Sequence, residues 1–231
     1  MIRSVTLPKL AALFASLALA SAAPAAVIWS ATSLSSFKSL EEQDDKTKEY
    51  HSTNGSTETL TAGVFKFHKV AADRRCEAKG ANGVSVTEGK TYAIGWRWKL
   101  SNTVNNNSIF QWKSYGSPMT QNYPFVIKMI NGKITFQHYP GGGSSQNLFS
   151  QSVSANTFYS NVIIITTSRN ASNGRVSYWF NGSQKVNNKA CKSFDGSNNE
   201  PKWGIYGAAG TVVDSFVTNL KIGTTYADVA P

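Results

Sequence analysis

Alternation of polar and apolar side chains is the clearest pattern in this sequence, and three short segments carry it: 75–77, 111–113 and 202–206. Side chains alternate between the two faces of a β-strand, so a strand through each segment separates two kinds of residue. One face carries polar, mostly basic side chains: Arg75, Glu77, Gln111, Lys113, Lys202 and Tyr206. The other face carries side chains suited to a core: Cys76, Trp112, Trp203 and Ile205. The pattern predicts three strands that form one wall of a basic cleft made for a polyanion.

Short runs rich in aromatic and β-branched residues continue to the C-terminus, separated by Gly, Asn and Ser clusters. The predicted strands are 64–69, 74–79, 91–100, 108–114, 124–130, 133–139, 161–168, 174–180, 202–207 and 211–222. Two turn signals, Asn131-Gly132 and Asn173-Gly174, fall between adjacent runs and predict hairpins. The polar stretch 41–58 is predicted to be loop, with room for one short helical turn. Such a series indicates an all-β fold, a β-jelly roll or antiparallel two-sheet sandwich with an open basic groove on one sheet.

Two further segments extend this picture. In 92–99 the aromatic and aliphatic side chains share a face that we assign to the core: Tyr92, Ile94, Trp96 and Trp98. Arg97 and Lys99 then point outward. Lys128 and Gln137 lie on the polar faces of the next predicted strands, so we expect them to extend the basic surface.

The N-terminus has the pattern of a secretory signal peptide, which we place at residues 1–22. Two basic residues, Arg3 and Lys9, precede an apolar run over 10–20 that is too short to span a bilayer. Its removal takes the formal charge of +10 to about +8, and residues 23–231 fit a single domain. We expect a secreted, extracellular, monomeric protein. Four N-x-Ser sequons are typical of exposed loops in a secreted glycoprotein: Asn54, Asn106, Asn170 and Asn181.

The two cysteines, Cys76 and Cys191, could pair as a disulfide in an oxidising compartment. Two buried free thiols are the alternative. Neither residue has the neighbours of a catalytic or metal-binding cysteine.

The polar residues of the predicted wall suit the cleavage of a uronate polymer by β-elimination. The proton on C5 of a uronate becomes acidic once a donor such as Gln111 or Arg75 neutralises the adjacent carboxylate and stabilises the enolate. A base must then take this proton and an acid must protonate the leaving O4. One tyrosine, Tyr206, can do both where the two groups lie on the same side of the sugar. A nearby cation, Lys202 or Arg75, would help it to act as a base.

The sequence resembles the secreted polysaccharide lyases of β-jelly-roll fold, most closely the glucuronan lyases of polysaccharide lyase family 20. The resemblance runs from about residue 63 to the C-terminus and is densest in 109–113, 123–129 and 202–207. The sequence is similar, more loosely, to the alginate lyases of family 7. Their Arg-x-Glu-Leu strand looks like residues 75–78, their Gln-x-His strand like 111–113, and their final tyrosine strand like the stretch that ends at Tyr206.

The resemblance implies specific roles. Gln111 would neutralise the substrate carboxylate, Tyr206 would be general base and acid, and His68 is the best candidate for a histidine that family 20 uses upstream of the glutamine. Lys113 stands where the alginate lyases carry a catalytic histidine, which favours an endo-acting glucuronan lyase over an alginate (polymannuronate) lyase. Arg75, Glu77, Lys113, Lys128 and Lys202 are then the expected substrate-binding residues.

Other functions remain open at this stage. A glycoside hydrolase needs two carboxylates about 5 to 9.5 Å apart, but only Glu77 and Asp214 fall clearly on predicted strands. A non-catalytic module that binds acidic polysaccharides would use the same basic groove without an aligned glutamine and tyrosine. Nucleic-acid and membrane partners are not expected, because the chain has no known nucleic-acid-binding module and no later apolar span. No cofactor or metal-ligand cluster is predicted, although loop carbonyls could hold a structural calcium.

Overall fold

The computed structural model describes residues 26–231, which fold into two stacked antiparallel β-sheets. The strands of the first half are β1 (Trp29–Ser30), β2 (Phe37–Asp44), β3 (Thr57–Thr61), β4 (Val64–Lys69), β5 (Asp73–Ala81), β6 (Thr91–Leu100) and β7 (Asn107–Tyr115). Those of the second half are β8 (Phe125–Ile130), β9 (Lys133–Gly141), β10 (Ser144–Ser152), β11 (Tyr159–Thr166), β12 (Arg175–Phe180), β13 (Ser183–Ala190), β14 (Asn198–Gly207) and β15 (Val213–Gly223). Two short helices complete the fold: the 3₁₀ helix η1 (Leu34–Ser36) and α1 (Tyr226–Val229).

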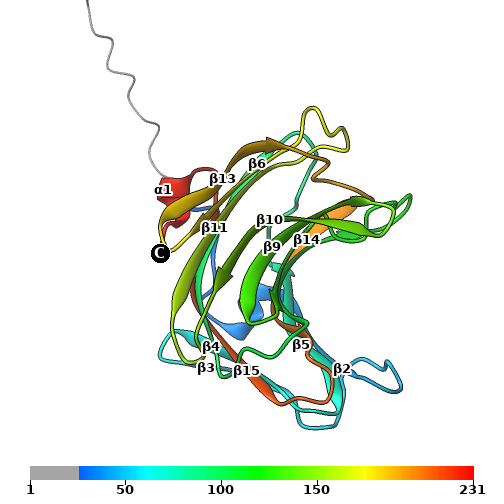
Figure 1. Ribbon diagram of the computed structural model, residues 1–231, viewed down its shortest axis with the longest axis vertical. Coiled ribbons are helices and arrows are strands. Elements are labelled where there is room, and N and C mark those ends of the chain that lie inside the picture. The colour runs from blue at the N-terminus through cyan, green and yellow to red at the C-terminus, as the bar shows by residue number, and fades with distance from the viewer. Residues whose placement is uncertain (1–25) are drawn as a thin grey trace, which may run out of the picture.

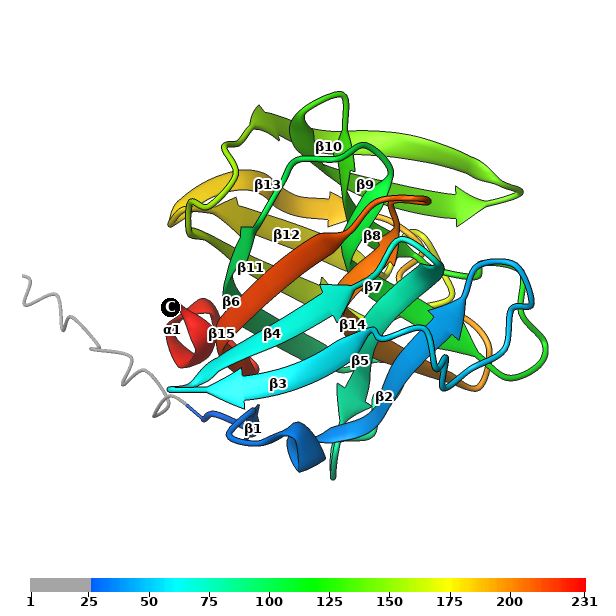
Figure 2. The ribbon, with the colours of Figure 1, turned by 90° about the horizontal axis from the view of Figure 1, so that it is seen from below.

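Sheet A has the strand order β13-β12-β11-β6-β15-β4-β3, and β1 pairs with β15 beside this path. Sheet B has the order β10-β9-β8-β7-β14-β5-β2. The sheets form two curved layers, with β11 and β6 in one and β9, β14 and β5 in the other (Figure 1). Helix α1 lies on the outer side of sheet A, at the end of β15 (Figures 1 and 2). The predicted all-β two-sheet sandwich is confirmed.

The core between the sheets is built by the apolar halves of the alternating strands. Trp96, Trp98, Trp112 and Trp203 are at most 1% exposed and pack with a large set of Phe and Ile side chains. Trp96 stacks on Phe110 across the sandwich, with ring centroids 4.8 Å apart. Burying such side chains contributes roughly 1.5 to 3 kcal/mol each. The prediction that these aromatic faces form the core is confirmed, which fixes the opposite faces of the same strands as outer surface.

Every strand predicted between residues 64 and 222 is present, with end points that differ by a few residues. The Asn131-Gly132 signal forms the two-residue turn between β8 and β9, where both residues have positive φ. Asn173-Gly174 instead belongs to a longer connection between β11 and β12. The stretch 41–58 is less irregular than expected, because β2 extends to Asp44 and β3 begins at Thr57.

The cysteine pairing is corrected by the structure: Cys76 and Cys191 are both buried free thiols. Cys76 lies on β5, next to the β2 edge of sheet B, and its Sγ atom contacts the Glu58 carboxylate at 3.2 Å. Cys191 follows β13, which is the edge strand at the other end of sheet A. The order of strands therefore keeps the two thiols at opposite ends of the sandwich. Burial raises the pKa of both, that of Cys191 to about 12.

The signal peptide predicted at residues 1–22 lies outside the described residues. Within residues 26–231, no helix has the length and apolar character that crossing a membrane requires.

Candidate active site

Three neighbouring strands of sheet B carry the predicted wall, with β14 between β5 and β7. The register sets Lys202 opposite Lys79 on one side and Gln111 on the other. Tyr206 is opposite Arg75 on β5 and Ser108 on β7. The prediction that the three segments form one surface is therefore confirmed.

Gly204 separates Lys202 from Tyr206 on this surface and carries no side chain. Its φ is +131°, and a Cβ atom there would lie 2.3 Å from the carbonyl oxygen of Cys76. The strand also has a bulge against β7 between Trp203 and Tyr206. A glycine is required here because only glycine adopts this conformation so close to another backbone.

A buried ion network forms the floor of the wall. The Lys202 ammonium is completely buried and donates to Glu41 Oε2 at 2.8 Å and to Glu77 Oε2 at 2.7 Å. Arg75 donates to the same Glu41 oxygen at 3.0 Å, and Lys79 lies 3.5 Å from the other. Burial alone would raise the pKa of Glu41, but the charges of Lys202, Arg75 and Lys79 hold it below its ordinary value. The Glu41 carboxylate is therefore ionised, and cations contact the carboxylates of both Glu41 and Glu77.

Gln111 is oriented by this network. Its Nε2 atom donates to Glu77 Oε1 at 2.6 Å, and a carboxylate accepts only, so the amide nitrogen must face Glu77. An amide NH₂ group has two hydrogens, and the second remains free for another acceptor. Lys202 thus fixes Glu77, and Glu77 fixes the donor of Gln111.

Tyr206 stands at the far end of the same wall between two guanidinium groups. Arg74 Nη2 donates to the Tyr206 hydroxyl oxygen at 2.8 Å, and its Cζ atom is 5.3 Å from the ring centroid. Arg75 Cζ lies 4.7 Å from the same centroid. The phenol oxygen therefore accepts from a cationic donor, and a second cation lies near its ring.

Gln111 and Tyr206 line one hollow of about 190 Å³ on the outer face of sheet B. Tyr123, Tyr139 and Lys128 line the same hollow from β8, β9 and the loop before β8. A second hollow, of about 310 Å³, is lined by Arg75, Lys79, Lys113, Tyr115 and Tyr50 among others. The two hollows lie side by side on the same face, because Arg75, which lines the second, contacts the ring of Tyr206, which lines the first. We call the two hollows together the groove.

Lys113 is a cation of this groove whose charge changes just above neutral pH. Its burial, and then the charges of Lys202 and Arg75, lower its pKa to about 8. The ammonium donates to Asn122 Oδ1 and lies 5.3 Å from the Tyr115 ring centroid. Lys128 also has a lowered pKa because of burial.

The sequence matches a known family over almost the whole described chain. A profile of the family described as "Polysaccharide lyase" matches residues 29–229. This chain belongs to that polysaccharide lyase family. A search of curated proteins found no relative by sequence.

Solved structures of other lyases share the fold of this polysaccharide lyase. An endo-β-1,4-glucuronan lyase from the fungus Trichoderma reesei aligns with a TM-score of 0.60 at 15% identity, covering 84% of this chain and 98% of the other. The family 7 alginate lyase A1-II′, solved in complex with product, gives 0.62 at 12% identity, covering 83% and 96%. The family 7 alginate lyase AlgAT5 gives 0.56 at 12% identity, covering 79% and 92%. At these identities the similarity establishes a shared fold.

The expected place of His68 in the lyase is corrected by the structure. His68 is on β4 in sheet A, whereas Gln111 and Tyr206 are on sheet B. Its Nδ1 atom pairs with Asp214 Oδ1 at 2.6 Å on the outer face of sheet A. Alternation correctly gave the strand and its face, but it does not say which sheet a strand joins.

The structure also divides the residues expected to bind substrate. Arg75, Lys113 and Lys128 line the hollows. Lys202 and Glu77 are 0% and 1% exposed and form an ion pair with each other. They therefore support the surface from below and do not contact a polymer. Because Lys202 and Arg75 bind both Glu41 and Glu77, these two carboxylates are not free for hydrolysis. Within residues 26–231, no group of three or more His, Cys, Asp or Glu side chains could hold a metal.

Two important residues escaped the sequence analysis. Glu41 lies in the stretch that was predicted to be loop, so its place on β2 beside Arg75 was not visible. Arg74 precedes Arg75 and by alternation should face the core, but it is at the start of β5, where its side chain reaches round to Tyr206. The sequence feature that could have indicated Arg74 is the pair of consecutive arginines, Arg74 and Arg75, at the start of a predicted strand.

We expect Lys202→Met to lower the free energy of unfolding by about 3 to 5 kcal/mol, because it leaves two buried carboxylates without their shared cation. Lys48→Met is the control. It removes an exposed ion pair with Asp45 and should cost less than about 1 kcal/mol. Urea unfolding of both variants gives the comparison. A loss for Lys202→Met as small as that of the control would contradict the assigned network.

Proposed function

We propose that this lyase cleaves a β-1,4-linked polyuronate by β-elimination, with Tyr206 as general base and acid. The observation that carries the proposal is the hollow lined by both Gln111 and Tyr206. An oriented amide donor and a phenol flanked by cations face one space there. The wall around them is basic. Its six cations, Arg74, Arg75, Lys79, Lys113, Lys128 and Lys202, outnumber its three carboxylates, Glu41, Glu77 and Glu200. Such a wall attracts a polymer with one carboxylate per sugar.

The reaction needs no group beyond those of the wall. Gln111 donates to the substrate carboxylate and stabilises the charge that moves onto it when the C5–H bond breaks. Tyr206, as phenolate, takes the C5 proton, and the electron pair of that bond forms the C4=C5 double bond. The C4–O4 bond breaks as O4 leaves, and the same tyrosine returns the proton to O4. The products are a new reducing end and an unsaturated uronate end.

Arg74 serves the proton transfer at Tyr206. Its guanidinium donates to the hydroxyl oxygen, so it stabilises the phenolate before the transfer and is placed to do so again after the proton reaches O4. Gln111 and Arg74 thus stabilise the two oxygens on which negative charge appears. Glu77 and Lys202 position the first of these donors.

We propose glucuronan as the polymer, and polymannuronate as the second candidate. In both, the C5 hydrogen and O4 lie on the same side of the ring, as a single tyrosine requires. Lys113, in place of the histidine of alginate lyases, favours glucuronan. The N-terminal pattern and the polymeric substrate are consistent with a secreted enzyme that acts outside the cell.

The test of the activity is ultraviolet absorbance of the unsaturated product during incubation with glucuronan, polymannuronate, polyguluronate and pectate. We expect the fastest signal with glucuronan. Tyr206→Phe should lower turnover by a factor of about 100 to 10,000, and Gln111→Ala by about 100 to 1,000. Tyr92→Phe, which removes a hydroxyl on sheet A that accepts from Thr87 N and donates to Ser85 O, should keep normal turnover. Near-normal activity of Tyr206→Phe would refute the mechanism, and no product from any polymer would refute the function.

The lowered pKa of Lys113 predicts a pH dependence of binding. The ammonium is mostly charged at pH 7 and mostly neutral at pH 9, because its pKa is about 8. In Tyr206→Phe protein, which holds the polymer without cleaving it, the affinity for glucuronan should fall about fivefold between these pH values. With Lys113→Arg added, the charge persists and this fall should disappear, while any effect of Lys128 remains. An equal fall in both proteins would exclude Lys113 as the cause.

A further inference from the structure

The outer face of sheet A carries a second basic surface, remote from the candidate active site on sheet B. The register aligns four residues in a row across the strands: Lys99 on β6 is opposite Phe216 on β15, which is opposite Lys66 on β4, which is opposite Thr59 on β3. Phe158, from the loop before β11, extends the row past Lys99. We call Arg97, Lys99, Lys66, Phe158 and Phe216 the outer-face row.

Cations and aromatic rings alternate along this row. Lys99 Nζ lies 4.4 Å from the Phe216 centroid and 5.0 Å from that of Phe158. Lys66 is 5.8 Å from the Phe216 centroid, and Arg97 is 5.2 Å from that of Phe158. Both rings are only half-buried. Exposed rings between cations can pack against the apolar faces of sugars while the cations pair with acidic groups.

The charge of this surface is only partly balanced. Asp214 pairs with Lys66 at 3.1 Å and with His68 at 2.6 Å. It is the single carboxylate that the described strands β3, β4, β6 and β15 turn outward near the row. Lys99 and Arg97 have no carboxylate partner among the described residues within ion-pairing distance. The row therefore keeps a net positive charge of about two.

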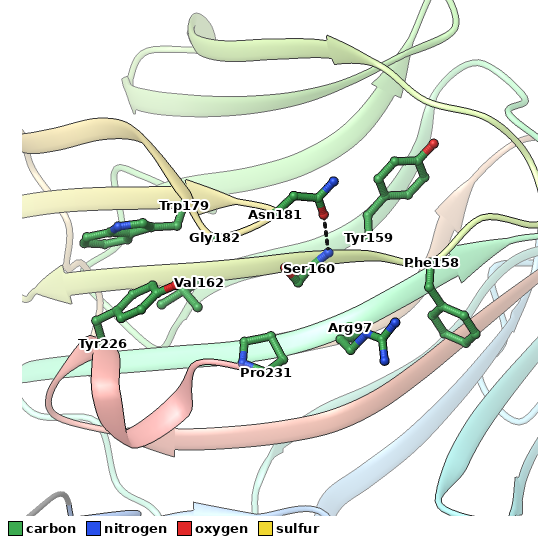
Figure 3. Close-up of a pocket in the computed structure, with 10 residues that line it drawn as sticks. All are labelled: Arg97, Phe158, Tyr159, Ser160, Val162, Trp179, Asn181, Gly182, Tyr226 and Pro231. Atoms are coloured by element: carbon green, nitrogen blue, oxygen red, sulfur yellow. Dashed lines mark hydrogen bonds between the residues drawn. The ribbon is translucent and has the colours of Figure 1, made fainter.

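Two hollows meet at Phe158. One, of about 400 Å³, is lined by Thr59, Lys66, Lys99, Phe216 and Phe158 among others. The other, of about 330 Å³, runs from Phe158 and Arg97 to Trp179 and Tyr226 (Figure 3). In this view the Arg97 guanidinium lies beside the Phe158 ring, and Trp179 and Tyr226 are at the opposite end of the hollow. The hollows lengthen the row into a shallow groove across sheet A.

We propose that the outer-face row is a second, non-catalytic binding surface for an anionic polysaccharide chain. The choice of polyuronate as its ligand rests on the proposed function, whereas the anionic and carbohydrate character follows from the cations and exposed rings. The candidate active site and the row lie on different sheets, so one short oligosaccharide cannot occupy both. A long polymer, or neighbouring chains of a polymer gel, can occupy both at once. The second contact then raises the effective concentration of substrate at the active site.

The test compares two triple variants with the same change in net charge. Lys66→Gln/Arg97→Gln/Lys99→Gln removes the cations of the row. Lys90→Gln/Lys185→Gln/Lys189→Gln removes three exposed lysines elsewhere and controls for long-range attraction. Each is made in wild-type protein and in the Tyr206→Phe background. Thermal unfolding of each variant tests whether the substitutions leave the fold intact.

In the Tyr206→Phe background, retention during electrophoresis through a glucuronan-containing gel measures binding to the polymer. We expect the row variant to bind about tenfold more weakly than the control, the sum of three exposed charge contacts. In wild-type protein, turnover of a glucuronan tetrasaccharide should be equal in both, and KM for the long polymer should rise only in the row variant. Equal retention of the two triple variants would overturn the second surface. If the wild-type protein cleaves no polyuronate but the row variant still loses retention, the second surface is supported and the proposed function is contradicted.

Discussion

The candidate active site depends on a lysine that no substrate can touch. Lys202 is completely buried on the central strand of the wall, where burial of a lone ammonium would be strongly unfavourable. Glu41 and Glu77 make it possible by approaching from β2 and β5. Because the three charges satisfy one another, Glu77 is fixed, and its second oxygen fixes the amide of Gln111. A rigid donor of this kind lowers the cost of reorganisation when charge develops on a substrate.

The same buried ion network divides the charged residues of the groove into those that support the surface and those that can contact a substrate. Charges that are paired below the surface position other groups, while Arg74, Lys113 and Lys128 keep donors at or near the hollows. Gln111 is held by a carboxylate, that of Glu77. Tyr206 instead lies against two guanidinium groups, and no carboxylate is among the contacts described for it. One end of the wall therefore presents an oriented amide donor and the other a phenol beside two guanidinium groups, as the proposed mechanism requires. Family membership as a polysaccharide lyase is consistent with this division.

Much of this arrangement could be predicted from the sequence, because it follows from alternation. The faces of 75–77, 111–113 and 202–206, and the core position of Trp112 and Trp203, need only a period of two. What alternation cannot supply is which strands become neighbours. Without knowledge of the neighbouring strands, three features could not be placed from the sequence. These are His68 on the other sheet, Glu41 beside Lys202, and the two cysteines at opposite ends of the sandwich. Arg74 was missed for another reason, because a side chain at the start of a strand is free to leave the face that its position predicts.

The most direct measurement is the structure of the Tyr206→Phe protein with a bound glucuronan tetrasaccharide. The account predicts one uronate carboxylate at about 3 Å from Gln111 Nε2, with the C5 hydrogen of that sugar directed at the place of the missing hydroxyl and O4 on the same side. A sugar bound in the groove with its carboxylate away from Gln111, or with C5 facing away from position 206, would contradict it.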